Sequence, residues 1–242
     1  MKIIPLLFAA LAASATVTPS ARASVDILID GFTSAPAGVY PITVDSGEPV
    51  VRAGFEYLPD VLSGVRYVSL TRSFASLPGG DSPVTLDIAS SAPGLSISAP
   101  SFYASRLDLF YAFVPPGPDA PAIDVSSAQA FLFTVSSYTS TNNQPLTIRP
   151  EVYDNFGEVT SFTRSIPTSA TPFTILLPFS DFIPTSEFSI FDYSNIDDLT
   201  FTLDLPPGGQ IEIASIRAIA IPEPTLALSL APLALLRRRP AR

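Results

Sequence analysis

The stretch Thr200-Phe201-Thr202-Leu203-Asp204-Leu205 sets the pattern that decides the fold. Apolar and polar side chains alternate strictly, so Phe201, Leu203 and Leu205 point to one side of an extended chain and the other three to the opposite side. A strand with one apolar and one polar side is typical of an antiparallel sheet with a single buried face. The stretch therefore predicts a half-buried antiparallel strand.

Similar short runs, separated by Pro, Gly, Ser and Asp, recur along the chain from Val25 onward. Helical spacing is scarce, and Pro-rich segments such as Pro206-Pro207-Gly208-Gly209 favour loops at the ends of sheets. We expect strands at residues 25–30, 50–57, 65–71, 83–89, 103–113, 128–137, 145–153, 159–165, 173–177, 199–205 and 210–219. This spacing predicts an all-β fold: one domain, residues 24–220, forming a two-layer antiparallel β-sandwich of jelly-roll type, with a closed barrel as the alternative.

The segment Asp154-Asn155-Phe156-Gly157 has Asp first and Gly last, as a type I turn prefers, so it predicts a hairpin within residues 147–164. The chain has 17 Phe residues and no Trp. The Phe side chains are expected to fill the space between the sheets. Our candidates for this core are Phe110, Phe131, Phe133, Phe173, Phe179 and Phe201.

The charge of the chain argues against nucleic acid as a partner. Six of the 13 basic residues and one of the 22 acidic residues lie outside residues 24–220, so seven arginines face 21 acids there, a net charge of −14. Such a surface repels phosphates, which disfavours DNA and RNA. Cations or neutral sugars are better candidates as ligands, and the alternative is that the charge only keeps the protein soluble.

The residue inventory excludes most catalytic machinery. The chain has no His and no Cys, and Lys occurs only as Lys2. Ser-His-Asp, Cys-His and Ser-Lys nucleophile systems cannot form without these residues, nor can disulfides or metal sites that need His or Cys. Carboxylate chemistry of the glycosidase kind remains open, but no pair of acids stands out. We therefore expect a protein that is not an enzyme.

Both ends of the sequence have the composition of targeting signals. Residues 1–23 combine a positive start, an apolar stretch and the small-residue pattern Ala21-Arg22-Ala23, which predicts a helical signal peptide cleaved before Ser24, with an N-terminal anchor as the alternative. Residues 221–242 combine Pro222-Glu223-Pro224, an apolar run expected to form a short helix, and the basic cluster Arg237, Arg238 and Arg239. The alternative for this tail is a frayed basic terminus.

In the order of these three parts the tail resembles the sorting signal of PEP-CTERM proteins. This resemblance implies export through the general export machinery of a Gram-negative bacterium and transient contact with the inner membrane. It also implies processing by an exosortase-type membrane protease, followed by residence at the cell surface or in the extracellular matrix. The apolar run, Leu226 to Leu236, is interrupted by Pro232, and a full helical span needs about 20 residues.

Residues 173–219 resemble the closing third of jelly-roll domains of the carbohydrate-binding-module type, through Pro178-Phe179-Ser180-Asp181-Phe182 and the two strands that follow. Such modules present aromatic platforms to sugar rings, and this chain has no Trp. Tyrosines in predicted strands are the remaining candidates for sugar stacking, each with burial in the core as the alternative. They are Tyr67, Tyr103, Tyr111, Tyr138 and Tyr153.

Calcium is the one cofactor that the sequence suggests. Oxygen donors cluster at Asp192, Asn195, Asp197 and Asp198, which we expect in the loop before the strand that begins at Leu199. The alternative is a solvated turn capped by Asp or Asn. By analogy with structural ions in the resembling modules, Asp30 after the first strand is a second candidate ligand.

Two functions fit these observations. The first, which we favour on the sequence, is a non-catalytic surface or matrix protein with a structural or adhesive sandwich. It is motivated by the tail, the acidic surface and the absent catalytic residues. The second is a polysaccharide-binding module that recognises exopolysaccharide, motivated by the resemblance of residues 173–219.

Overall fold

A computed structural model describes residues 25–45, 50–73, 83–88, 93–101, 103–111, 123–184 and 191–221. The predicted signal peptide with Ala21 and Ala23, the Pro222-Glu223-Pro224 motif, the arginines 237–239 and both predicted helices lie outside these residues. Within the described part of the chain, no helix is long and apolar enough to span a membrane.

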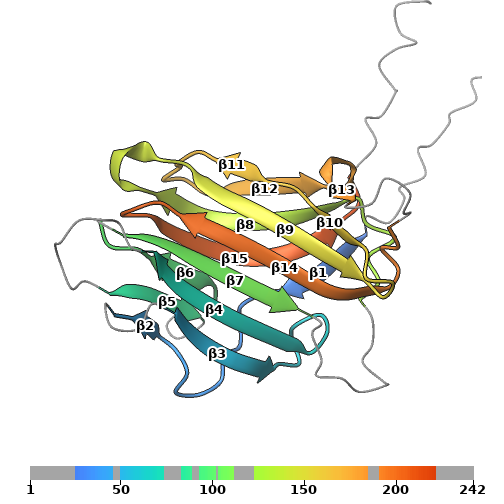
Figure 1. The fold of residues 1–242 in the computed structure, drawn as a ribbon, viewed down its shortest axis with the longest axis horizontal. Coiled ribbons are helices and arrows are strands. Elements are labelled where there is room, and N and C mark those ends of the chain that lie inside the picture. Colours follow the sequence, from blue (N-terminus) through green and yellow to red (C-terminus); the bar gives the residue numbers. More distant parts are fainter. Residues whose placement is uncertain are drawn as a thin grey trace, which may run out of the picture.

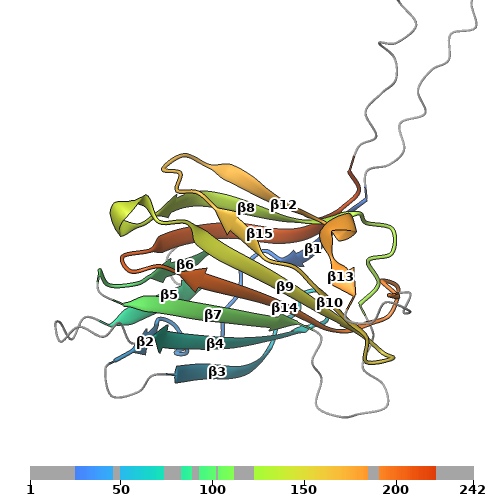
Figure 2. The same ribbon diagram turned by 45° about the horizontal axis from the view of Figure 1, so that its top comes forward.

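The described strands form two antiparallel sheets packed face to face (Figures 1 and 2). The seven-stranded sheet has the order β12-β8-β15-β6-β5-β2, with β1 also paired to β15. Its members are β1 (Asp26–Asp30), β2 (Ile42–Val44), β5 (Val84–Ile88), β6 (Leu95–Ser98), β8 (Ala130–Thr139), β12 (Phe173–Pro178) and β15 (Gln210–Ile219).

The eight-stranded sheet has the order β13-β10-β9-β14-β7-β4-β3, with β11 also paired to β9. Its members are β3 (Val50–Tyr57), β4 (Val65–Ser73), β7 (Ala104–Tyr111), β9 (Leu146–Asp154), β10 (Val159–Ser161), β11 (Arg164–Ile166), β13 (Ile183–Pro184) and β14 (Ile196–Leu205). Two short 3-10 helices, η1 (Thr141–Asn143) and η2 (Phe179–Asp181), complete the described elements. The predicted two-layer sandwich is confirmed, and the two separate sheets argue against the closed barrel.

Each predicted strand overlaps at least one observed strand, with two corrections. The segment expected as one strand at residues 159–165 is split into β10 and β11, which pair with different halves of β9. Strand β14 begins at Ile196 instead of Leu199, so Asp197 and Asp198 belong to the strand and not to the loop before it. The short strands β2, β6 and β13 were not expected, because two to four residues are too few to show a clear alternation.

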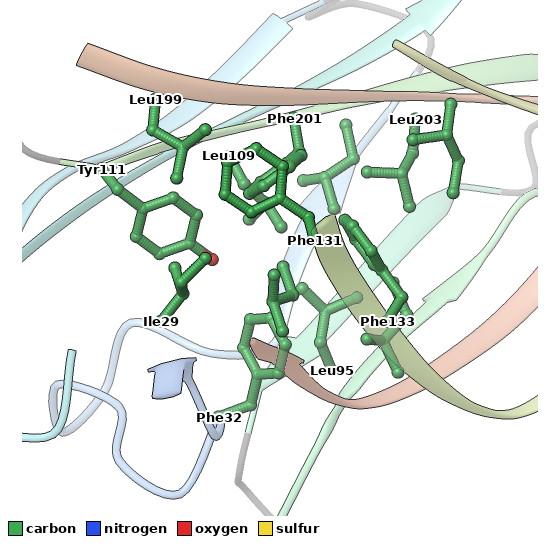
Figure 3. Packing of buried hydrophobic residues seen from close by; sticks show 14 of the residues in the cluster. Ile29, Phe32, Leu95, Leu109, Tyr111, Phe131, Phe133, Leu199, Phe201 and Leu203 are labelled. Carbon is green, nitrogen blue, oxygen red and sulfur yellow. The ribbon is translucent and has the colours of Figure 1, made fainter. Parts of the chain in front are cut away.

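The core lies between the sheets and is centred on the Phe201 ring of β14 (Figure 3). Its ring meets Phe131 and Phe133 of β8 edge to face, with centroids 5.3 Å and 5.0 Å apart. These three core predictions are confirmed, because all three side chains are fully buried. Phe173 and Phe179 are only partly buried against the core. Phe110 is wrong as a core residue: it alternates with buried Leu109 and Tyr111 and lies on the opposite side of β7.

The predicted hairpin is also confirmed, since β9 and β10 pair antiparallel across the Asp154–Gly157 turn. The Gly157 N–H donates to the Asp154 carbonyl oxygen at 3.0 Å. Gly157 has φ 79°, a left-handed conformation that favours glycine. The buried Asp154 carboxylate accepts N–H bonds from Phe156 and Glu158, both at 3.0 Å. A single carboxylate thus satisfies two donors of the turn.

The described chain enters and leaves the sandwich at one place. The Ala220 N–H donates to the Val25 carbonyl oxygen at 3.0 Å, and the Ile221 N–H donates to Gln129 Oε1 at 2.8 Å. Strand β15, which precedes this point, is bonded along both of its edges. β8 covers one edge, while β6 and β1 share the other.

Candidate functional site

The outer face of the eight-stranded sheet carries its polar and aromatic side chains in rows that cross the strands. Because side chains alternate between the two faces, residues directly opposite on neighbouring strands share a face. The pairing register aligns a first row, which we call the aromatic row: Tyr67, Phe110, Thr200, Glu151, Ser161 and Ile183. A second row, which we call the acidic row, is formed by Ser69, Asp108, Thr202 and Arg149.

Sequence pattern and packing explain why these residues face outward. On β14 the apolar residues of the TFTLDL stretch are buried in the core, so Thr200, Thr202 and Asp204 lie on the other side, where neighbouring side chains cover the two threonines almost completely. On β7 the same alternation leaves Asp108 and Phe110 outside. The outer face of the central strands is therefore polar.

Direct contacts hold the side chains of this face in place. The rings of Tyr67 and Phe110 meet edge to face, with centroids 5.4 Å apart and an interplanar angle of 66°. The Thr202 hydroxyl donates to Asp108 Oδ1 at 2.7 Å. Arg106 Nε bonds Asp204 Oδ1 at 2.7 Å across the strand pair. Each of these contacts joins side chains of two neighbouring strands among β4, β7 and β14.

The second arginine of the face, Arg149 on β9, is paired along its own strand. Its Nε lies 3.3 Å from Glu151 Oε1. The hydrogen bond that Arg106 donates to Asp204 is the main cause that raises the pKa of Arg106. The arginines of the face therefore already have carboxylate partners.

Two carboxylates of this face titrate abnormally because they are partly buried. Burial raises the pKa of Asp198 to about 6, and nearby Glu151 and Asp197 add to this, while a hydrogen bond from the Thr200 hydroxyl opposes it. Burial also raises the pKa of Asp108, against the opposing effect of its bond from Thr202. Both groups are thus poorly solvated acceptors at neutral pH.

The predicted sugar-stacking tyrosines divide into three kinds. Tyr67 and Tyr153 are half-buried on the outer face, where Tyr153 stands opposite Asp198. Tyr103 is half-buried before β7, with the Arg72 guanidinium 3.7 Å from its ring centroid. Tyr111 and Tyr138 are fully buried, so both are wrong as platforms.

Sequence reasoning missed several residues of the face. Phe110 was expected in the core, and Tyr57, which is 69% exposed at the end of β3, was not considered. The signal for Phe110 was present, because it is out of phase with Leu107 and Leu109 on the same strand.

Asp30 is no calcium ligand in this fold, because its carboxylate is already engaged inside the sandwich. Arg66 Nη1 donates to Asp30 Oδ2 at 2.8 Å, and the Tyr111 hydroxyl donates to the same oxygen at 3.1 Å. Glu56 takes the other side of the guanidinium, where Arg66 Nε donates to its Oε2 at 2.8 Å. The cation that neutralises Asp30 is thus a guanidinium, supplied by the chain.

This buried network is closed by two more groups. Arg66 Nη2 donates to the Ser34 carbonyl oxygen at 3.1 Å, and the Tyr40 hydroxyl donates to Glu56 Oε1. Arg66 and Asp30 are fully buried, and Glu56 is nearly so. Burial raises the pKa of Asp30 even though Arg66 lowers it. Buried charges of this kind are tolerated only when each is paired.

The other calcium candidates are arranged as a capped turn. Asp192 Oδ1 accepts bonds from the backbone N–H and the hydroxyl of Ser194, at 2.9 Å and 2.6 Å. Asp198 lies within β14, on the outer face. Across the described ranges, no three acidic side chains gather in a way that could hold a metal ion. The donor set does not fit a calcium site, and the geometry matches the capped-turn alternative.

Two pockets lie away from the outer face. One, of about 330 Å³, is lined by residues 33–38 together with Tyr40 and Ile88. The other, of about 340 Å³, lies between β11 and β12, where Arg164 Nη1 donates to the Leu176 carbonyl oxygen at 2.7 Å. Neither pocket shares a residue with the aromatic or acidic row.

The molecule is thus a two-sheet β-sandwich with a polar and aromatic outer face. The sequence matches no protein-family model and none of the curated proteins. Solved structures similar to this chain include the family 11 carbohydrate-binding module of a cellulosomal cellulase from Clostridium thermocellum, with 15% identity and a TM-score of 0.41, covering 84% of this chain and 99% of that one.

Two further solved structures are carbohydrate-binding modules. The family 30 module of another cellulosomal cellulase from Clostridium thermocellum has 10% identity and a TM-score of 0.41, with 82% of this chain and 99% of that chain covered. A family 61 module in complex with β-1,4-galactotriose has 11% identity and a TM-score of 0.33, with 68% and 89% covered.

Proposed function

We propose that this protein is a non-catalytic polysaccharide-binding β-sandwich, and that it binds along the outer face of the eight-stranded sheet. The observation that carries the proposal is the alignment of the aromatic row with the acidic row. The rings of Tyr67 and Phe110, which contact each other, lie beside the Asp108 carboxylate, which the buried Thr202 hydroxyl holds in place. Aromatic surface next to a few fixed polar groups is the usual composition of a sugar-binding surface.

The dimensions of the face suit a chain rather than a single sugar. The aromatic row crosses six strands, from β4 to β13. Neighbouring strands are about 4.8 Å apart, so the row spans about 24 Å. An extended glycan that lies across the strands can therefore contact Tyr67 at one end and Ile183, which is 71% exposed, at the other.

We further propose that the protein is exported and processed. The basis is the sequence alone: residues 1–23 have the parts of a signal peptide, and Pro222-Glu223-Pro224 with Arg237–Arg239 have the order of a PEP-CTERM-like sorting signal. Its partners are then the export machinery and an exosortase-type protease, with transient inner-membrane contact. Its destination is the cell surface or matrix, where exopolysaccharide is the available ligand.

A purely structural or adhesive role is the second candidate. Tyr67 and Phe110 meet edge to face, so they form no flat pair of coplanar rings. That arrangement favours packing of the two rings against each other over stacking on a sugar.

Affinity electrophoresis of the full chain in gels that contain single polysaccharides tests the binding proposal. We expect at least one polymer to retard the protein, and the Y67A/F110A double variant to lose most of this retardation. The matched control is Phe156→Ala, because Phe156 is 76% exposed but lies at the tip of the β9–β10 hairpin, outside both rows. Retardation that survives in the double variant, or is absent with every polymer, contradicts the proposal and favours the structural role.

The processing proposal has a separate test. Mass spectrometry of the protein recovered from the cell surface should find a C-terminus close to Pro222-Glu223-Pro224. A surface protein that still ends at Arg242 contradicts it.

A further inference from the structure

The charged groups of the outer face are not balanced. In the described part of the chain, the salt bridges of this face join Arg106 to Asp204 and Arg149 to Glu151. Both arginines are thereby engaged. Asp108 and Asp198, in contrast, accept hydrogen bonds from the Thr202 and Thr200 hydroxyls.

Threonine hydroxyls orient a carboxylate without neutralising it. Asp108 and Asp198 lie on β7 and β14, on either side of the Phe110–Thr200 pair of the aromatic row. Thr200 is almost fully covered, so a ligand here contacts the Phe110 ring and has a negative charge on both sides. Partial burial makes these charges poorly screened by water.

We propose that the outer face selects polysaccharides that carry no negative charge and rejects those with carboxylate or sulfate groups. This inference rests on the proposed function and names the ligand class of the same site. A sugar hydroxyl can donate to a free carboxylate oxygen of Asp108 or Asp198. A uronate or sulfate at the same place meets like charge, because among the described side chains of this face the carboxylates of Asp108, Asp198, Asp204 and Glu151 outnumber the guanidinium groups of Arg106 and Arg149.

Pairs of polymers that share a backbone and differ in charge test this selectivity. Hydroxyethyl cellulose is compared with carboxymethyl cellulose, and dextran with dextran sulfate, by affinity electrophoresis of the full chain at low salt. We expect the neutral member of a pair to retard the protein about tenfold more strongly, a ratio that falls as salt is added. The D108N/D198N variant should reduce this ratio severalfold by gaining affinity for the anionic member.

A control variant separates the face from the net charge of the whole protein. D124N/D192N removes the same two charges from exposed turns outside both rows, and asparagine can keep the turn bonds to Ser126 and Ser194. We expect this variant to discriminate like the wild type. Equal gains in both variants would assign the discrimination to total charge and overturn the inference.

Two further outcomes distinguish a failure of the proposed function from a failure of the proposed selectivity. If no polymer of either charge retards the wild type, the proposed function itself fails. If the wild type binds an anionic member as strongly as its neutral counterpart at low salt, polysaccharide binding stands but the selectivity proposed here is wrong.

Discussion

Arg66 on β4 donates to Asp30 at the end of β1, at 2.8 Å, so a fully buried ion pair joins the eight-stranded sheet to the seven-stranded sheet. Glu56 on β3 completes the pairing from the other side of the guanidinium. Removing one member of such a group leaves a buried charge with neither a partner nor water. The stability lost is then far larger than the net stability that the intact pair contributes.

We predict that Arg66→Met lowers the free energy of unfolding by about 3–5 kcal/mol, measured by chemical denaturation. The triple variant D30N/E56Q/R66M, in which no charge remains, should recover part of the loss. A destabilisation by R66M below about 1 kcal/mol, or a triple variant no more stable than R66M, would show that the pair is not desolvated as described.

Asp198 should make stability depend on pH. Its pKa in the folded protein is about 6, above the ordinary value of 3.8, so the folded state binds the proton more tightly than the unfolded state. Stability therefore rises as pH falls through 6 towards 4, and the ionised form is a cost at neutral pH.

Between about pH 7 and pH 5, the wild type should gain about 1 kcal/mol more than Asp198→Asn, a figure reduced for partial exposure. Denaturation curves at both pH values measure this difference. Asp45→Asn, at an exposed position, serves as the control and should behave like the wild type. Identical pH dependence of D198N and the wild type would contradict the burial of this carboxylate.

Two phenylalanines should differ sharply in their effect on stability. Phe201→Ala opens a cavity between Phe131 and Phe133 and should cost about 3–5 kcal/mol. Phe110→Ala removes a half-buried ring from the outer face and should cost about 1 kcal/mol. Thermal or chemical denaturation distinguishes them, and similar costs would mean that the outer face is covered like a core.

The hairpin turn offers a local test. Asp154→Ala removes the acceptor of the Phe156 and Glu158 N–H groups and should cost about 2 kcal/mol. Asn155→Ala, at the exposed next position, should change stability by less than about 0.5 kcal/mol. Equal effects at both positions would rule out the buried carboxylate as the organiser of this turn.

Calcium should leave the melting temperature unchanged. The candidate carboxylates are engaged, Asp30 with Arg66 and Asp192 with Ser194. An ion that bound only the folded protein would raise the melting temperature, and more so as its concentration increased above its Kd. The melting temperature of the full chain is measured in excess calcium and in chelator. A higher melting temperature in calcium would contradict this prediction and support a calcium site.

The alternation of side chains predicted the strands but not their neighbours. β7 lies between β4 and β14, which are distant from it in sequence and from each other. Such pairing depends on contacts between remote segments, which no local pattern contains. The identity of the outer face, and hence the candidate site, came only from the structure.

The tyrosines show how far the alternation of side chains along a strand predicts which of them are buried. Tyr111 is in phase with buried Leu107 and Leu109, so the sequence could have placed it in the core. Tyr67 alternates with buried Val68 and could have been placed outside. The burial of Tyr138 could not have been predicted in this way. The register between β8 and β15 shifts near Ser136, which reverses the alternation of buried and exposed residues beyond it. Arg66 likewise occupies an apolar phase, a conflict that signals a buried charge.

The contact between Val25 and Ala220 has a mechanical consequence. A chain held through residues beyond Ile221 transmits load directly into β15. This strand is bonded along both edges, by β8 on one side and by β6 and β1 on the other. A pull along its axis loads these hydrogen bonds together in shear instead of opening them one at a time. A force applied to the outer face is thus opposed through β15, a strand of the other sheet that is hydrogen-bonded along both of its edges.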